Sequence, residues 1–142
     1  MASANFTNLA DALARAQINF ASDPFKFMLA SSAPSATNLD TWVNRSDVTN
    51  EATGSGYTAG GVSVTATVGA VDTTNNRVPV TFADLSPMLA TATVSAVGGY
   101  IYKNTGNAAT DRLVQWVDFG GTVSSTSGAF NIDFTTPLYI NA

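Results

Sequence analysis

Ten carboxylate side chains offer this sequence its widest choice of chemistry. Asp118 and Asp133 each lie among alternating apolar residues, so two neighbouring strands could bring them face to face. Glycoside hydrolysis needs such a pair of carboxyl groups, held about 5–10 Å apart. An aspartate between apolar residues of a strand ordinarily points to solvent, so a surface role is the main interpretation. A carboxylate hydrolase remains an alternative hypothesis.

A second acidic group lies in a long polar segment. Asp40, Asp47 and Glu51 could offer oxygen ligands to calcium, and the last two are four residues apart. The segment lacks the regularly spaced acidic residues of a calcium-binding loop. We therefore expect no resident metal and no cofactor.

Cysteine and histidine are absent from the 142 residues. Their absence excludes Ser-His-Asp and Cys-His nucleophiles, Cys/His zinc sites, haem ligation by histidine and iron–sulfur clusters. The glycine-rich segment 54–61 lacks the lysine of a phosphate-binding loop and is not followed by a helical pattern, so it predicts a tight turn. We expect no catalytic residues and a protein that is not an enzyme.

The composition is low in charge and rich in hydroxyl and amide side chains. Charged residues make up 11% of the chain, against about 25% in an average soluble domain. The net charge of −4 and the pI of 4.3 exclude a basic nucleic-acid footprint. The chain has 19 Thr, 13 Ser and 12 Asn, which give a weakly self-repelling surface suited to close protein neighbours.

The sequence shows no pattern typical of a membrane anchor or a secretion signal. No window approaches the roughly 18 consecutive apolar residues of a membrane span. The N-terminal segment lacks the basic start and apolar stretch of a secretion signal. We expect synthesis in the cytoplasm and no membrane partner.

Helical spacing marks residues 7–18, where Leu9 and Leu13 share a face. We define residues 1–22 as an N-terminal helical arm. One interpretation docks this arm on its own domain, and the other makes it a detachable arm that docks on a neighbour. The sequence leaves both open.

The pattern of alternating apolar residues and turns in residues 23–142 predicts an all-β domain. A strand at 25–29 precedes a long loop at 31–61, in which Trp42 indicates a short helical turn around 40–44. Further strands are expected at 62–70, 78–82, 91–103, 112–119, 130–134 and from 138 onward. Residues 83–89 are expected to form a crossing loop and residues 122–127 a polar connector.

Glycine and proline residues set the expected interruptions. Gly120 and Gly121 should break a strand, and the pair Gly98-Gly99 suggests a bulge or a close backbone approach. Pro79 should lie in an edge strand or a bulge, because it cannot donate to a ladder. The spacing of strands and turns predicts an antiparallel β-sandwich or jelly-roll-like barrel with one short N-terminal helix.

The segment TNEATGSGYTAGG at 49–61 resembles one found in small virion structural proteins of tailed bacteriophages. In those proteins an E-x-x-G-x-G-Y-x-x-G-G segment leads into a strand. An aromatic strand, here 100–104, and a strand ending in D-F-G-G, here 118–121, follow in the same order. The similarity covers residues 25–140.

The resemblance implies a non-enzymatic virion component, assembled in the host cytoplasm. The leading hypothesis is a decoration or cement protein that binds the capsid lattice through the major capsid protein or other virion proteins. Self-association is expected, and a trimer would follow from lattice geometry. The predicted docking residues are Leu9, Leu13, Ile18, Trp42 and Tyr57, and the predicted structural turns contain Gly54, Gly56, Gly60, Gly61, Gly120 and Gly121.

Two alternatives complete the hypotheses. The first is a neck, tail or fibre-attachment component of the virion. The second is a carbohydrate-binding β-sandwich module, which requires an exposed aromatic row that includes Trp42 or Trp116. Aromatic side chains in an all-β domain more often belong to the core, which disfavours this alternative.

Overall fold

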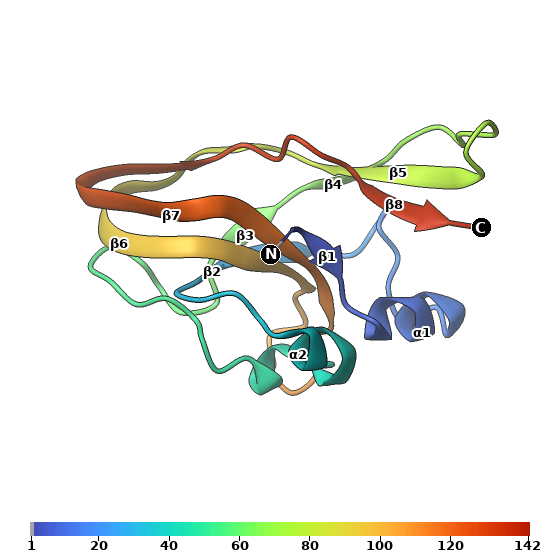
Figure 1. Cartoon of the computed structure of the whole chain (residues 1–142), viewed down its shortest axis with the longest axis horizontal. Helices are drawn as coiled ribbons and strands as arrows, with labels where there is room; N and C mark the ends of the chain where they lie inside the picture. The colour runs from blue at the N-terminus through green and yellow to red at the C-terminus, as the bar shows by residue number, and fades with distance from the viewer. Residues whose placement is uncertain (1) are drawn as a thin grey trace.

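The computed structural model describes residues 2–142, and strands make up most of the regular structure (Figure 1). The strands are β1 (Ala4–Asn5), β2 (Phe25–Ala30), β3 (Val62–Val64), β4 (Ala66–Val68), β5 (Arg77–Phe82), β6 (Leu85–Lys103), β7 (Leu113–Ile132) and β8 (Leu138–Asn141). The helices are α1 (Asn8–Ala14), α2 (Ala36–Thr41) and the 3-10 turn η1 (Arg45–Asp47). The predicted mainly β fold, with a short helix near the N-terminus, is confirmed.

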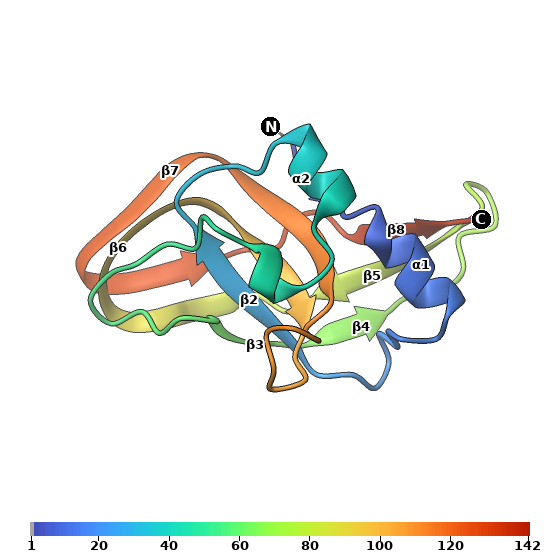
Figure 2. The same cartoon turned by 90° about the horizontal axis from the view of Figure 1, so that it is seen from below.

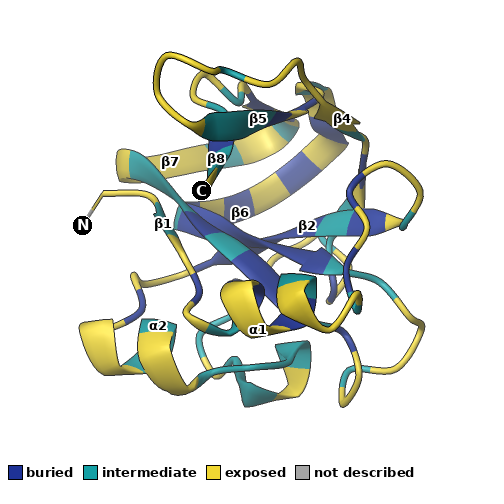
Figure 3. Ribbon diagram, turned by 90° about the vertical axis from the view of Figure 1, so that its right-hand side faces the viewer, coloured by how far each residue is buried: buried dark blue, intermediate teal, exposed yellow. Residues whose placement is uncertain are grey.

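Two antiparallel sheets form a sandwich-like arrangement (Figure 3). The larger sheet has the order β1-β7-β6-β2-β3, and the smaller has the order β4-β5-β8. Only Thr65 separates β3 from β4, so the chain passes directly from one sheet to the other. That side of the sandwich is closed by continuous chain, whereas β1 and β8 end the sheets on the opposite side.

The larger sheet has an apolar layer on each face, because successive side chains of a strand point to opposite faces. In β2, Phe27 and Leu29 join the core between the sheets, whereas Met28 joins a second cluster on the other face. The second cluster also contains Phe6, Ala30, Tyr100, Tyr102, Leu113 and Trp116. The segment with α2 covers this second face (Figure 2).

Strands β6 and β7 are longer than the sequence predicts. Residues 85–89, expected in a crossing loop, belong to β6, and residues 120–127, expected as a break and connector, belong to β7. Each strand offers the other a long ladder, and Thr and Ser suit an exposed strand face. Three extra residues of β7 are absorbed as a bulge between the pairs Ala96↔Val123 and Gly98↔Asp118. The bulge predicted at Gly98-Gly99 is present. The interruption of the strand predicted at Gly120-Gly121 was wrong, because β7 continues through both residues.

Pro79 lies in β5, the central strand of the smaller sheet, so the edge-strand alternative was wrong. The bulge alternative fits better, because the three steps from Gly69 to Asp72 face only two steps from Pro79 to Arg77. The Pro79 carbonyl accepts a hydrogen bond from the Gly69 N–H at 2.8 Å, just beyond the end of β4. The missing N–H therefore faces the side where β4 has already ended. A central strand tolerates this proline because the one ladder bond that it cannot donate falls at the end of β4, opposite Gly69.

Helix α1 is shorter than the predicted 7–18 segment. Arg15 is its C-cap, and Ala16 adopts a left-handed φ of 56°, which ends the helix. The chain then continues through buried Ile18 and Phe20 into β2. The Lys103 ammonium secures this stretch, donating to the Gln17 carbonyl at 2.7 Å and pairing with Asp23 at 2.9 Å.

The long segment 31–61 is ordered by short local elements. Ser35 caps α2 through a reciprocal capping box with Asn38, and Asn44 and Asp47 form a second box at η1. The predicted helical turn near Trp42 is present, but it ends one residue before Trp42. No helix within residues 2–142 is long and apolar enough to cross a bilayer.

Candidate functional site

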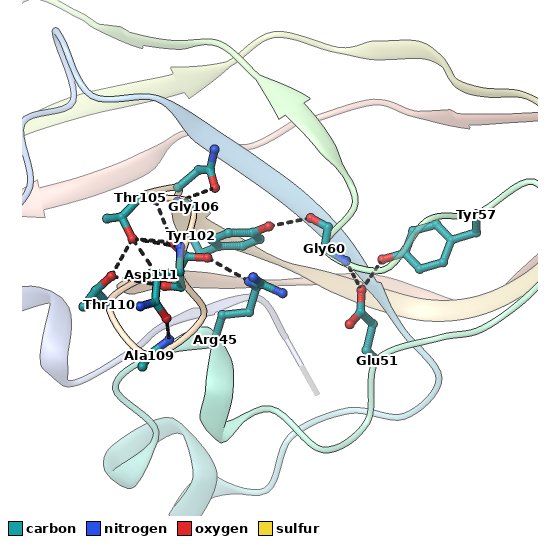
Figure 4. A network of polar contacts seen from close by, with 12 residues as sticks. Arg45, Glu51, Tyr57, Gly60, Tyr102, Thr105, Gly106, Ala109, Thr110 and Asp111 are labelled. Atoms are coloured by element: carbon teal, nitrogen blue, oxygen red, sulfur yellow. Dashed lines mark hydrogen bonds and ion pairs between the residues drawn. The ribbon is translucent and has the colours of Figure 1, made fainter.

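The motif segment 49–61 forms a hydrogen-bonded loop against the larger sheet (Figure 4). Glu51 Oε1 accepts hydrogen bonds from the Tyr57 hydroxyl at 2.8 Å and from the Gly60 N–H at 2.5 Å. The Tyr57 hydroxyl in turn accepts from the Leu29 N–H at 3.0 Å. One carboxylate therefore closes the loop on itself, and one phenol ties it to β2.

Tyr102 joins the same loop from β6. Its hydroxyl donates to the Gly60 carbonyl at 2.6 Å, so both backbone groups of Gly60 are bonded. Burial raises the pKa of Tyr102 to about 12, and the nearby Arg45 guanidinium acts against this rise. Burial and the neighbouring Glu51 carboxylate also raise the pKa of Tyr57 well above its usual value. Both hydroxyls therefore stay protonated at neutral pH and act as donors.

Close backbone contact explains why this loop needs glycine. Gly61 has a φ of 72°, and a Cβ there would collide with the Phe27 carbonyl. Gly54 and Gly56 lie against the backbone carbonyls of Thr93 and Thr91, where a Cβ would also collide. These glycines let the loop lie directly on β2 and β6.

The remaining predicted turn glycines, Gly60, Gly120 and Gly121, differ in backbone conformation and in the space around them. Gly60 and Gly120 have positive φ values of 92° and 77°, a backbone conformation that favours glycine. Gly121 is exposed within β7, and a Cβ there would meet nothing within 4 Å. Neither Gly120 nor Gly121 ends the strand.

An ion pair between partly buried Arg45 and fully buried Asp111 anchors η1, in the first half of the long segment 31–61. The Arg45 Nε donates to Asp111 Oδ2 at 2.8 Å, and the Asp111 side chain is fully buried. Asp111 Oδ1 accepts from the Thr105 N–H at 2.6 Å and from the Thr105 hydroxyl at 2.8 Å. The Arg45 guanidinium also lies over the Tyr102 ring, 5.3 Å from its centroid.

The two charges shift each other's titration. Burial acts to raise the pKa of Asp111, but the hydrogen bonds from Thr105 and Arg45 outweigh it and lower the pKa below its usual range. Burial acts to lower the pKa of Arg45, and Asp111 outweighs it. Both groups are charged at neutral pH, so the pair holds the loop 104–112 to η1.

A groove of about 660 Å³ opens between the free sides of the two sheets. Asp118 and Asp133 both line it, as the hydrolase hypothesis requires of a shared site. Half-buried Val117, Phe119 and Phe134 form part of its apolar wall. Its size and mixed lining suit an organic ligand or a protein segment.

The calcium hypothesis does not find its ligands together. Asp40 accepts from the Thr7 hydroxyl, Asp47 from the Val43 and Asn44 N–H groups, and Glu51 from the motif loop. Among residues 2–142, no three acidic side chains are grouped to hold a metal ion.

The aromatic row required of a carbohydrate-binding module is also not found. Trp116 is fully buried, and half-buried Trp42 packs against Tyr100 with ring centroids 6.1 Å apart. No Phe, Tyr or Trp of residues 2–142 falls in the exposed class. Both tryptophans belong to the apolar cluster on the outer face of the larger sheet, Trp116 within it and Trp42 packed against it.

The predicted docking residues lie mostly inside the protein. Leu9 and Ile18 are 3% and 4% exposed and belong to the core between the sheets, and Leu13 packs against it. Trp42 and Tyr57 are half-buried in the contacts described above. These five side chains therefore offer little free surface for docking on another protein.

No protein-family model, curated protein or solved structure matches this chain. Sequence analysis did not identify Arg45 or Asp111 as partners. The acid Glu51 was visible in the motif, but its role as the acceptor that closes the loop was not.

Proposed function

We propose that this chain is a non-enzymatic structural protein of a bacteriophage virion, which decorates or cements the capsid lattice. The resemblance of 49–61 and of the later motifs supports the class of protein. One structural observation carries the docking role. Three segments without a charged residue, 52–71, 85–102 and 119–132, meet through β6, β7 and the motif loop.

Parts of these three segments form one end of the molecule, where β6 and β7 curl round opposite the end that holds the C-terminus (Figure 1). Ser55 of the motif loop pairs with Thr93 of β6 there. The exposed side chains of the two strands include Thr91, Thr93, Ser95, Thr122, Ser124, Thr126 and Ser127. We call these seven residues the hydroxyl surface.

An uncharged hydroxyl surface suits repeated docking on neighbouring proteins. It brings no like charges together when many copies approach one another. Its hydroxyl groups can donate and accept hydrogen bonds. Weak contacts of this kind add up when the partner is a lattice of identical subunits.

Many polar contacts near the motif serve the protein's own loops. Glu51, Tyr57 and Tyr102 hold the motif loop, and Arg45 and Asp111 hold the loop 104–112. This use of charged and phenolic groups supports a structural role over a catalytic one. The major capsid protein is the partner that the lattice role implies.

A neck, tail or fibre-attachment position is the second candidate, since the same motifs and the same hydroxyl surface support it. The two positions differ in the number of copies per particle. A capsid lattice offers hundreds of sites, and a neck or fibre base offers about a dozen or fewer.

Adding charge to the hydroxyl surface tests the docking role. Thr122→Lys and Thr126→Lys replace exposed threonines of β7 that have no side-chain hydrogen bond within residues 2–142. Each variant, and Thr74→Lys as a control in the exposed turn 73–76, is mixed with virions assembled without this chain and sedimented.

We expect both β7 variants to lose at least tenfold in bound copies, while the control binds like the wild type. Melting temperatures must match the wild type for the comparison to count. Equal binding by all variants would contradict docking through the hydroxyl surface. Absence of wild-type binding would contradict the virion role itself.

A further inference from the structure

The last strand leaves one edge of the smaller sheet open. β8 pairs with β5 alone, in the register Arg77↔Asn141, Val78↔Ile140 and Pro79↔Tyr139. No other strand of the described residues pairs with its second edge. The hydrogen bonds that β5 makes show which N–H and C=O groups of β8 point toward that open edge.

Arg77 and Pro79 turn their backbone groups away from β8. Arg77 exchanges hydrogen bonds with the backbone of Asp72 at 2.8 and 3.1 Å, and the Pro79 carbonyl bonds to Gly69. Backbone directions alternate along a strand, so Val78 and Val80 supply the bonds to β8. Ile140 and Leu138 are their partners.

Tyr139 and Asn141 therefore point their N–H and C=O groups outward. The bond from the Ala142 N–H to the Asn76 carbonyl at 2.9 Å fits the same alternation. Both outward residues line the groove described above. A further strand beside β8, at the usual spacing of about 4.8 Å, would enter this groove.

The open edge is complementary to itself. When two β8 strands pair antiparallel about Ile140, Tyr139 of the first copy lies opposite Asn141 of the second. Asn141 of the first copy likewise lies opposite Tyr139 of the second. Because these residues carry the outward groups, the two pairs form four backbone hydrogen bonds. We propose that β8 pairs with β8 of a second copy across a two-fold axis, joining two small sheets into one of order β4-β5-β8-β8-β5-β4.

Apolar packing and charge both support a second copy as the occupant. Ile140 of the second copy would face the same side as Ile140 of the first, which packs against the core between the sheets. Asp133 is exposed in that groove, and no Lys or Arg lines it. The β8 side chains of the second copy carry no charge. In each copy the Arg77 guanidinium lies beside β8, 3.7 Å from the centroid of the Tyr139 ring.

The opposite edge of the same sheet gives the competing dimer. On β4, the alternation turns Ala66 and Val68 outward, and Val68 and Val71 are exposed apolar residues. A dimer through β4 would bury these two side chains. The experiment must therefore separate the two edges.

Proline substitution separates them, because it removes one outward N–H and leaves the pairing with β5 intact. Asn141→Pro removes two of the four bonds across the proposed axis, and Asn141→Ala changes the same side chain but keeps the N–H. Val68→Pro makes the equivalent change on β4. Sedimentation velocity from about 1 µM to about 1 mM measures the monomer–dimer equilibrium of each full-length chain.

We expect a wild-type dimer, a dissociation constant raised roughly 30-fold by Asn141→Pro, and changes below about threefold for Asn141→Ala and Val68→Pro. A wild type that stays monomeric throughout would overturn the proposal. A dimer disrupted by Val68→Pro and not by Asn141→Pro would assign it to β4.

Amide hydrogen exchange of the unmodified protein gives an answer without any substitution. On concentration, the Tyr139 and Asn141 amides should slow at least tenfold, while the Leu138 and Ile140 amides, already bonded to β5, keep their rates. Dimerisation without this slowing would overturn the proposal. The inference does not depend on the virion role, because β8 lies away from the hydroxyl surface (Figure 1).

Discussion

Asp111 is the single charged side chain in the buried class within residues 2–142. It accepts hydrogen bonds from a backbone N–H, a hydroxyl and a guanidinium, so its negative charge is satisfied in the folded protein. Loss of the Arg45 guanidinium would leave the buried Asp111 carboxylate without its ion-pair partner, which is costly for a buried charge. The stability of the loop 104–112 therefore depends on the ionised form of one residue.

The lowered pKa of Asp111 predicts how stability changes in acid. An unfolded aspartate titrates near about 3.9, and the folded value lies lower. The stabilisation is therefore fully present above about pH 4 and is lost as the pH falls through the folded pKa. We expect Asp111→Asn to cost about 3 kcal/mol at pH 7 and to flatten the fall in stability below pH 4.

Urea unfolding between pH 2 and pH 7 measures both effects. Asp133→Asn is the control, because Asp133 is exposed and should change stability by less than about 0.5 kcal/mol. An Asp111→Asn variant with the wild-type acid dependence would show that the ion pair does not carry the pH response.

At the scale of elements, α1 and the segment after it belong to the core between the sheets. Leu9, Ala12, Ile18 and Phe20 are all buried there, and the Phe20 ring stacks on Phe25 of β2 with centroids 5.2 Å apart. This packing favours the first interpretation of the arm, in which it docks on its own domain. A detachable arm would have to expose these four side chains.

We expect Leu9→Ala to lower the free energy of unfolding by about 3 kcal/mol, because it leaves a cavity in the core. Leu13→Ala is the matched control, since Leu13 is only half-buried and its loss should cost about 1 kcal/mol. Denaturant unfolding measures both variants. A Leu9→Ala protein as stable as the wild type would mean that the arm is not part of the cooperative unit.

Local patterns predicted most of the strands, because alternation at positions such as Phe25, Phe27 and Leu29 depends only on neighbouring residues. The full lengths of β6 and β7 could not be predicted, because pairing partners decide whether Gly120 ends a strand or lies in a bulge. Contacts between residues far apart in the sequence could not be predicted either. Arg45 and Asp111 are 66 residues apart, and no local spacing relates them.

At the scale of the whole molecule, charge is unevenly distributed. The end formed by the curled β6 and β7 carries parts of the three uncharged segments, whereas the Arg45–Asp111 ion pair belongs to loops outside the two sheets. An uncharged end for docking and a free β8 edge for self-pairing would leave both contacts available in one assembly. A lattice protein needs such separate surfaces, one for the capsid and one for its neighbour.

The number of copies of this chain per purified particle tests the virion role most directly. Quantitative mass spectrometry measures it relative to the major capsid protein. We predict hundreds of copies, in fixed proportion to the capsid protein, as a decoration or cement role on the lattice requires. A dozen copies or fewer would assign the chain to the neck, tail or fibre base. Finding no copies in the particle would contradict the virion role.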